Sequence, residues 1–287
     1  MFRALYTAAS GMMAQQANLD NVANNLANSS TTGFRRRRLQ FQDLLYQNVV
    51  MPGAAATQQT TLAAGLQIGL GTRAASSEVI QLQGDFSATG NPLDLTIQGQ
   101  GFFQITLPTG ETAYTRSGAF QLDAQGNMVT ADGNPISPAI TIPTGATSIT
   151  VGADGTVSVT IPGQAAAQQV GSLQLALFPN PGGLNSVGNN LFLATTGSGD
   201  PVVASPGGSE GLGSIQQGYL EQSNVNVVEE FIAMILAQRS YEANSRVVQA
   251  ADEMPRSCAE AGVLQKVVAL QQIPEQILQA THYHRHA

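Results

Sequence analysis

Hydrophobic side chains recur every seven residues near the start of the chain. The repeat consists of Leu5, Met12, Leu19 and Leu26, with Ala8 and Val22 at its second position. Apolar residues at this period predict an amphipathic helix that packs against another helix in coiled-coil fashion. Residues 28–33 are rich in turn-forming types, so we expect the helix to end there.

A second helical pattern begins near residue 226. Asn226 is a suitable N-cap, and Glu229, three positions later, completes a capping box. The apolar face of this helix is formed by Val227, Phe231, Met234, Tyr241 and Val248. The simplest way to bury two such faces is to pack the helices on each other, which brings the two ends of the chain together.

Between the helices the pattern changes to short alternating segments. Residues 149–151 and 157–161 alternate around turn residues 153–156, and residues 120–122 and 128–129 flank another turn. These are hairpin patterns, and their frequency predicts an all-β sandwich or barrel. Residues 47–75 are rich in Gln, Thr, Ala and Gly without a firm period, which indicates an extended arm.

The sequence therefore predicts a mixed α and β fold. It combines a discontinuous helical, coiled-coil-like domain made from both ends of the chain with an all-β central domain and an extended arm. The expected boundaries are 1–33 and 219–254 for the helical domain, 34–75 and 205–218 for the arm and linker, 76–204 for the β-rich domain and 255–287 for an atypical tail.

Composition narrows the classes of function. The 287 residues carry a formal charge of −7, and only 11% are charged, under half of the roughly 25% usual for soluble domains. The acidic balance argues against nucleic acid as the main partner, and no apolar stretch reaches the roughly 18 residues of a membrane span. A single Cys excludes a disulfide within the chain, and the N-terminus lacks the pattern of a cleaved secretory signal.

The distribution of reactive side chains argues against catalysis. Residues 1–254 contain no His, Cys or Lys, so we expect no catalytic residue, no cofactor and no metal site in them. Gly99 and Gly101 lack the continuation of a nucleotide fingerprint and predict a tight β-turn. Asp123 and Asp154 stand beside turn residues, where Asp commonly caps its own backbone. The protein is therefore expected not to be an enzyme.

The last 33 residues differ from the rest. They hold the only lysine, the only cysteine and all three histidines, namely Lys266, Cys258, His282, His284 and His286. Pro255 should break or kink the second helix. Either residues 255–287 arise from a shifted reading frame or an altered stop, or they are a lineage-specific extension, and composition leaves both open.

Three ordered motifs resemble the axial proteins of the bacterial flagellar rod and hook. The first covers residues 1–36, including Ala23–Asn28 and Thr31–Arg35; the second is Gly99–Gln104 followed by Ala113–Arg116 and Gly118–Phe120; the third is Gly218–Val227 with Gln238–Glu242. Together they span about residues 1–254. Within the family, the arm-like residues 47–75 are similar to the segment associated with a straight, stiff distal part of the rod rather than with the flexible hook.

The resemblance implies a structural, self-assembling subunit. Its copies would form a helical tube with terminal helices inside and β domains outside, which transmits torque and conducts exported subunits. The implied partners are further copies, other rod and hook proteins, the basal-body rings and the flagellar type III export apparatus. The implied location is the basal body, from periplasm to outer membrane, reached without a cleaved signal peptide. A hook or proximal rod subunit, or a secreted adhesion or carbohydrate-binding β module, remains an alternative.

Candidate interface residues follow from the helical patterns. We expect the assembly interface to include Leu5, Met12, Leu19, Val22, Leu26, Phe34, Val227, Phe231, Met234, Tyr241 and Val248. The run Arg35, Arg36, Arg37 and Arg38 is either a subunit-bridging or a solvated patch. Asn18, Asn21, Asn25 and Asn28 form a polar stripe that faces the lumen of the tube or pairs subunits.

Overall fold

The computed structural model of the protein describes residues 2–52, 63–162, 166–208 and 211–253. These residues form two compact units. One contains the described residues within 1–19, 40–76 and 235–253, and the other those within 20–39 and 77–234. The tail, residues 255–287, and the part of the arm at 53–62 lie outside the described residues.

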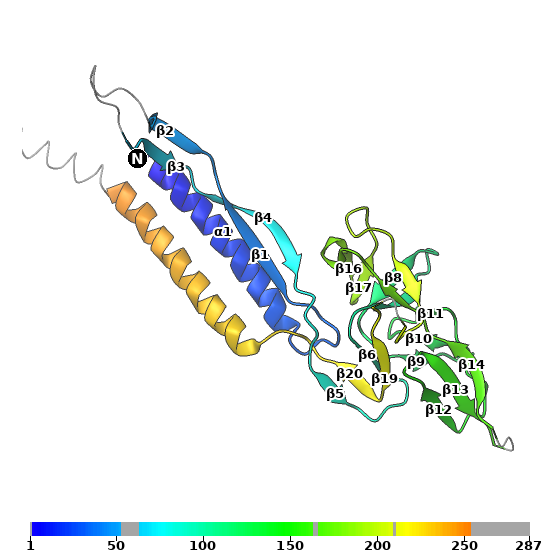
Figure 1. The fold of residues 1–287 in the computed structure, drawn as a ribbon. Coiled ribbons are helices and arrows are strands. Elements are labelled where there is room, and N and C mark those ends of the chain that lie inside the picture. Colours follow the sequence, from blue (N-terminus) through cyan, green and yellow to red (C-terminus); the bar gives the residue numbers. More distant parts are fainter. Residues whose placement is uncertain (1, 53–62, 163–165, 209–210, 254–287) are drawn as a thin grey trace, which may run out of the picture. The chain divides into compact units, whose positions relative to one another are not determined.

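Both terminal patterns form helices, as the sequence predicts. Helix α1 comprises Phe2–Ala27, and a second helix comprises residues 227–253 (Figure 1). Asn226 caps the second helix, since its Oδ1 accepts hydrogen bonds from the backbone N–H groups of Val228 and Glu229 at 3.1 and 3.4 Å. Past α1 the chain turns through residues 28–33, where Gly33 adopts a φ of 69°.

The strands follow one another at short intervals along the rest of the chain. They are β1 (Arg37–Asp43), β2 (Tyr46–Val50), β3 (Leu66–Gly69), β4 (Thr72–Val79), β5 (Phe86–Ala88), β6 (Leu95–Gln98), β7 (Phe102–Thr106), β8 (Thr112–Thr115), β9 (Gln121–Leu122), β10 (Met128–Val129), β11 (Ile136–Ser137), β12 (Ser148–Val151), β13 (Thr156–Thr160), β14 (Gln168–Ser172), β15 (Leu175–Leu177), β16 (Asn185–Gly188), β17 (Leu191–Leu193), β18 (Val202–Ala204), β19 (Ser214–Gln217) and β20 (Tyr219–Glu221). A short 3₁₀ helix, η1, comprises Pro181–Gly183.

A seven-stranded sheet organises the β-rich unit. Its order is β16-β17-β8-β7-β15-β18, with β11 also paired to β7. Strand β7 is buried on both faces because its side chains alternate between two apolar clusters. Phe103 and Ile105 belong to the larger core, whereas Phe102 packs edge-on against Phe178 and Phe192 in the smaller one. Strand β7 therefore contributes side chains to both apolar clusters of this unit.

Both hairpins expected from the sequence are present. Strand β12 pairs with β13, with Val151 opposite Val157, and β9 pairs with β10. The Asp123 and Asp154 carboxylates each accept hydrogen bonds from their own turns, from Asn127 and Thr156 above all, and these bonds hold the pKa of both groups below its usual range. Gly99 and Gly101 both take positive φ in the short connection between β6 and β7.

Residues predicted as an arm contain two short ladders. Strand β1 pairs with β4, and β2 pairs with β3 in a hairpin with Tyr46 opposite Gly69. In the second part of the predicted linker, residues 205–218, strand β19 pairs with β6. Just after this linker, β20 pairs with β5. The mixed α and β fold is thus confirmed, while the coiled-coil character of the helices and the role of residues 34–75 as an arm stay predictions.

Candidate functional site

The two terminal helices pack against each other through a narrow seam. In the first unit, Gly11 of α1 faces Asn244, and in the second, Asn25 donates a hydrogen bond to Glu230 at 3.3 Å. Burial on the second helix follows the same seam at Glu230, Ala237 and Ala251, which are seven or fourteen residues apart.

The expected interface residues divide into two groups. The heptad side chains Leu5, Met12, Leu19 and Leu26 are half-buried within the chain, as are Phe34, Met234 and Val248, and Val22 is fully buried. Val227, Phe231 and Tyr241 remain exposed. The first group is thus at least partly covered within its own chain, whereas the second is open to solvent. Gly11 and Asn25, which contact the second helix, are not heptad positions, and the role of the expected residues in the assembly interface stays a prediction.

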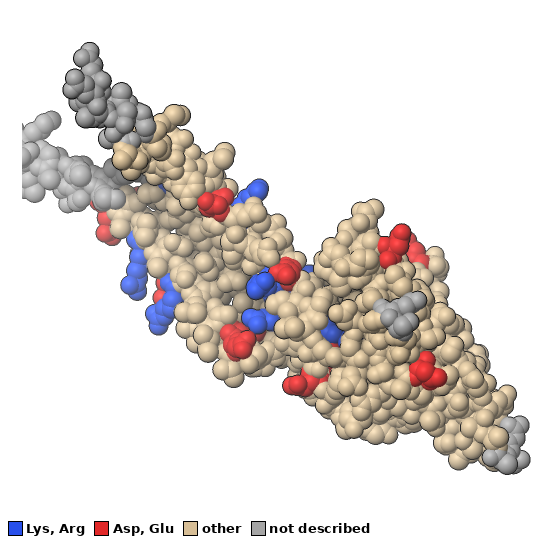
Figure 2. Space-filling view, viewed as in Figure 1, with Lys and Arg blue, Asp and Glu red and all other residues tan. Residues whose placement is uncertain are grey.

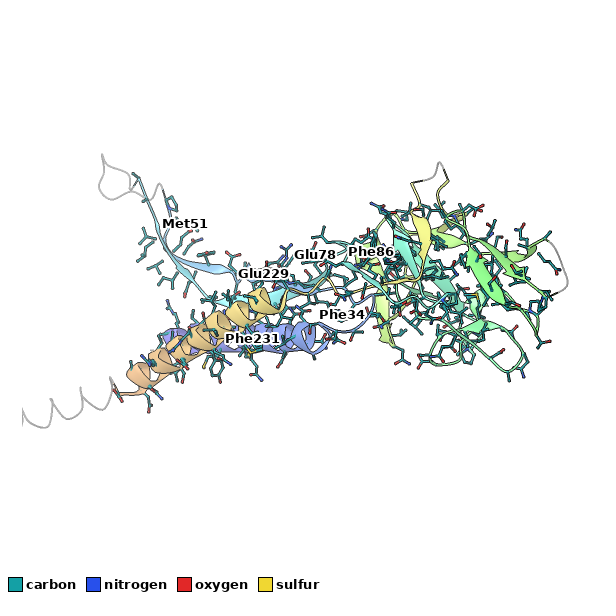
Figure 3. The ribbon with its side chains drawn as sticks, turned by 90° about the horizontal axis from the view of Figure 1, so that it is seen from below. Phe34, Met51, Glu78, Phe86, Glu229 and Phe231 are labelled. Carbon is teal, nitrogen blue, oxygen red and sulfur yellow. The ribbon has the colours of Figure 1, made fainter. Side chains whose placement is uncertain are left out.

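A second apolar face lies opposite the seam on the C-terminal helix. Ile232, Ile235 and Leu236 are 54%, 56% and 62% exposed, and Phe231, labelled in Figure 3, is 48% exposed. With Val228 they form a stripe at spacings of three and four residues, the repeat of one helical face. Only Phe231 of this stripe was among the expected interface residues. The sequence could have indicated the other residues of the stripe as well, because eight of the ten residues 227–236 are apolar.

The hairpin of β2 and β3 is also exposed. Leu45, Tyr46, Val49, Met51 and Leu66 all have more than half of their surface open. An isolated two-stranded hairpin is at best marginally stable in water, and this one presents apolar side chains instead of burying them. Like the helical stripe, it is a surface that lacks a covering element within the described residues.

The four consecutive arginines have different partners. Arg35 forms a buried ion pair with Glu221 at 2.7 Å, and Arg116 lies at the same distance from the other oxygen of that carboxylate. Burial lowers the pKa of Arg116, an effect that the Glu221 charge opposes. One carboxylate thus joins the segment after α1, strand β20 and the end of β8, and leaves two guanidinium groups dependent on it.

The next arginine ties the chain to the base of the second helix. Arg36 Nε lies 2.6 Å from Oε1 of the buried Glu230, and an Nη1 contact reaches Glu229 at 3.3 Å. Arg38 pairs with Glu78 at 2.9 Å on the surface. Three of the four arginines therefore make carboxylate contacts within one chain, which the sequence alone did not indicate.

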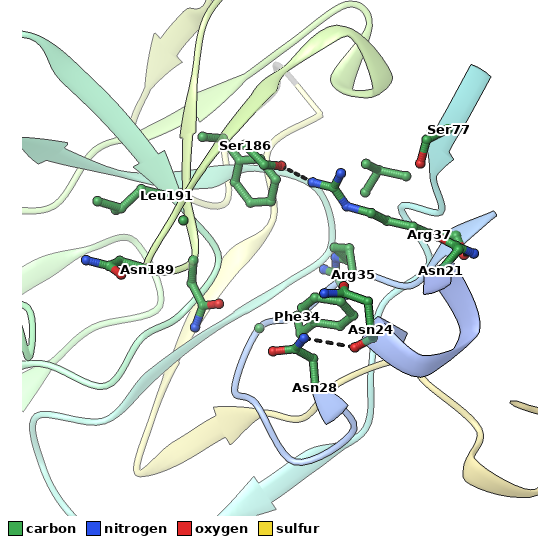
Figure 4. A pocket seen from close by; sticks show the side chains of 15 residues that line it. Asn21, Asn24, Asn28, Phe34, Arg35, Arg37, Ser77, Ser186, Asn189 and Leu191 are labelled. Atoms are coloured by element: carbon green, nitrogen blue, oxygen red, sulfur yellow. Dashed lines mark hydrogen bonds between the residues drawn. The ribbon is translucent and has the colours of Figure 1, made fainter. Parts of the chain in front are cut away.

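The remaining arginine, Arg37, extends over a cleft of about 500 Å³. The cleft is lined by Asn21, Asn24, Asn28, Gly33, Phe34, Arg35, Arg37, Ser77, Val79, Ser186, Gly188, Asn189, Asn190, Leu191 and Phe192. Figure 4 shows the Arg37 guanidinium directed to the Ser186 hydroxyl, to which it donates a hydrogen bond. Within the described residues, Arg37 has no carboxylate at ion-pair distance.

Most side chains of the asparagine stripe make hydrogen bonds within their own chain. Asn21 and Asn25 both donate to the carbonyl of Arg37 at 2.9 Å, and Asn25 Oδ1 accepts from the Arg37 N–H at 3.0 Å. Asn28 donates to the carbonyl of Asn24. Three of the four stripe residues are thus held by their own chain, and Asn18, which is half-buried, is left as the one for which a lumen or neighbour contact stays a prediction.

The described residues hold no group of three or more His, Cys, Asp or Glu that could bind a metal ion. The same residues include no helix that is long and apolar enough to cross a membrane.

Known families match three parts of the chain. Residues 5–35 match the family described as flagella basal body rod protein, residues 96–159 the flagellar hook protein FlgE/F/G D1 domain, and residues 216–259 the flagellar basal body rod FlgEFG protein C-terminal family. These segments contain the motifs at α1, around β7 and in the second helix.

Curated relatives match over nearly the whole chain. The flagellar basal-body rod protein FlgG of Caulobacter vibrioides is 48% identical over 259 residues, which cover 90% of this chain and 98% of the relative. FlgG of Buchnera aphidicola is 47% identical over 88% of this chain and 97% of its own length. FlgG of Bacillus subtilis is 38% identical over the same shares of both chains.

Proposed function

The chain belongs to the flagellar basal-body rod protein family, and on this premise we propose that its copies stack into a rigid helical tube in the distal part of the rod. The protein is a structural subunit of the flagellar basal body and not an enzyme. In the proposed tube, contacts run head to tail between unlike surfaces of successive copies. Such contacts generate an open helix when the rotation between copies does not close a ring.

The exposed apolar stripe of the C-terminal helix carries this proposal. Ile232, Ile235 and Leu236 point away from the seam that pairs the helix with α1, and contiguous exposed apolar surface marks protein contact sites. A neighbouring terminal helix would bury this stripe and so place the helical domain of residues 1–33 and 219–254 at the centre of the tube. The β-rich residues 76–204 would then lie outside.

The arm, residues 34–75, is proposed to stiffen the tube. Its β2–β3 hairpin exposes Tyr46, Val49 and Met51, and burial against the next subunit would supply the support that a two-stranded ribbon lacks. Torque would pass as shear over many such contacts. A hook or proximal rod subunit is the alternative assignment, and the straightness of the assembly separates it from the distal rod.

The same proposal implies further protein partners and a route of export to the basal body. We expect contacts with other rod and hook proteins and with the basal-body rings, and export through the flagellar type III apparatus without a cleaved signal peptide. The subunit would then act between periplasm and outer membrane.

A paired substitution tests the helical stripe. We expect Ile232→Ser with Ile235→Ser to reduce the number of subunits in isolated basal bodies at least tenfold and to abolish motility, because the interchain face becomes polar. The melting temperature of the monomer should change little, since both side chains are exposed in it.

The matched control is Val202→Ser with Val203→Ser, which removes two exposed apolar side chains, 46% and 42% open, from β18. Normal rods in this control and none in the helix variant would support the proposal. Normal rods in both variants would refute it.

A further inference from the structure

Arg37 stands apart from the other arginines of its run. Arg35, Arg36 and Arg38 are engaged by carboxylates of their own chain at 2.6–3.3 Å. The Arg37 guanidinium donates to the neutral hydroxyl of Ser186 and meets no carboxylate among the described residues. A bridge to another molecule requires a cation that its own chain has not already neutralised, and in this run Arg37 alone meets that condition.

The backbone of Arg37 is fixed in place. Its carbonyl accepts from Asn21 and Asn25, and its N–H donates to Asn25, all at 2.9–3.0 Å. The side chain is then steadied by Ser186 on β16. Because main chain and guanidinium are both held before any ligand arrives, binding costs less conformational entropy than it would for a free surface arginine.

The walls of the cleft suit a peptide. The amides of Asn24 and Asn189 and the hydroxyl of Ser77, which line the cleft, offer both donors and acceptors, while Leu191 adds apolar surface (Figure 4). A volume of about 500 Å³ falls within the range of roughly 300–1,000 Å³ found for ligand sites. Such a cleft accommodates a short turn with one acidic side chain and its flanking backbone.

We propose that this cleft receives an acidic turn from a second copy of the chain, whose carboxylate pairs with Arg37. Guanidinium and carboxylate groups form charge-assisted, often bidentate, hydrogen bonds. The inference rests on the proposed stacking of subunits, which brings copies into contact. The net charge of −7 means that every copy brings more acids than cations, and Glu111 and Asp132 are exposed on turns of the β-rich unit.

Charge reversal gives the first test. Arg37→Glu should lower the number of assembled subunits per basal body at least tenfold, and Arg37→Lys, which keeps the charge but loses the planar fork, should lower it less. The monomer should melt within a few degrees of wild type, because the backbone contacts of residue 37 do not depend on its side chain. Arg38→Glu, at the exposed neighbouring position, is the matched control and should assemble nearly normally.

A second-site rescue identifies the partner group. If a carboxylate of another copy occupies the cleft, an acidic-to-arginine change such as Glu111→Arg or Asp132→Arg should restore assembly of the Arg37→Glu variant. Equal assembly of wild type and Arg37→Glu would overturn the inference.

Photo-crosslinking in assembled rods separates the possible occupants. Benzoylphenylalanine placed at Ser77, and independently at Asn189, should crosslink to an acidic turn of another copy, read by mass spectrometry. A crosslink only to a different component, or rods that contain the protein without any crosslink between copies, would overturn this inference and leave the stacking proposal intact. Absence of the wild-type protein from rods would instead refute the proposed function, and this inference with it.

Discussion

At the scale of single residues, Glu221 links parts of the chain that are distant in sequence. Its two oxygens bind Arg35 and Arg116, and one of them also accepts the backbone N–H of Gly84 at 3.0 Å. Arg116 donates in addition to the carbonyls of Ile97, Gly99 and Gly101. A buried pair of this kind is only weak evidence of added stability, but removal of one partner leaves buried charge without compensation.

Glu221→Gln should therefore destabilise the β-rich unit strongly. We expect a loss of about 3–5 kcal/mol, because two buried guanidinium groups lose their shared carboxylate. Urea denaturation of the full chain, followed by tyrosine fluorescence in this protein without tryptophan, measures it.

The control is Glu242→Gln, which removes an exposed i,i+3 partner of Arg239 and should cost no more than about 1 kcal/mol. If the two variants unfold at the same urea concentration, the buried cluster is not the anchor that its contacts indicate.

At the scale of elements, the C-terminal helix has two faces with different roles. Ala237, 2% exposed, lies on the seam toward α1, whereas the adjacent Leu236, about 100° around the helix, is 62% exposed. The small residues Ala237 and Ala251 are buried on this helix, and the large apolar residues Ile235 and Leu236 are exposed. One helix thus serves the fold of its own chain and, as proposed, the contact with the next.

Substitutions at these adjacent positions should separate the two roles. Ala237→Leu overpacks the seam and should destabilise the helix pair by about 1–3 kcal/mol, seen as lower helicity and melting temperature by circular dichroism of the monomer. Leu236→Ala should leave both unchanged and reduce assembly. Equal effects of the two changes on the monomer would contradict a division into an inner and an outer face.

The sequence predicted these elements well where the signal is local. The helix predicted from Leu5 to Leu26, the Asn226 cap and the hairpin around residues 153–156 depend on neighbours within one or two turns, and all three are present. The partners of Arg35 and Arg36 lie nearly two hundred residues away, at Glu221 and Glu230. No periodicity reports such pairs. The sequence therefore indicated a charged patch, but neither the four ion pairs of Arg35, Arg36 and Arg38 nor the lack of a carboxylate partner for Arg37 among the described residues.

At the scale of the whole molecule, the low content of charged residues suits the stacking of copies. Only 11% of residues are charged, and tan, uncharged residues cover most of the face shown in Figure 2. Copies with few exposed charges can stack without accumulating repulsion, while amide and hydroxyl side chains still satisfy one another. In the run of four arginines, Arg35, Arg36 and Arg38 are engaged by carboxylates of their own chain, and we assign Arg37 to a neighbour.

The most direct test of this account is electron cryomicroscopy of the assemblies that the purified full-length protein forms. We predict a straight tube, with α1 and residues 227–253 nearest the axis and the β-rich residues 76–204 outside. A curved tube would instead identify a hook-like subunit. Closed rings, or a tube with the terminal helices on its outer surface, would contradict the central claim.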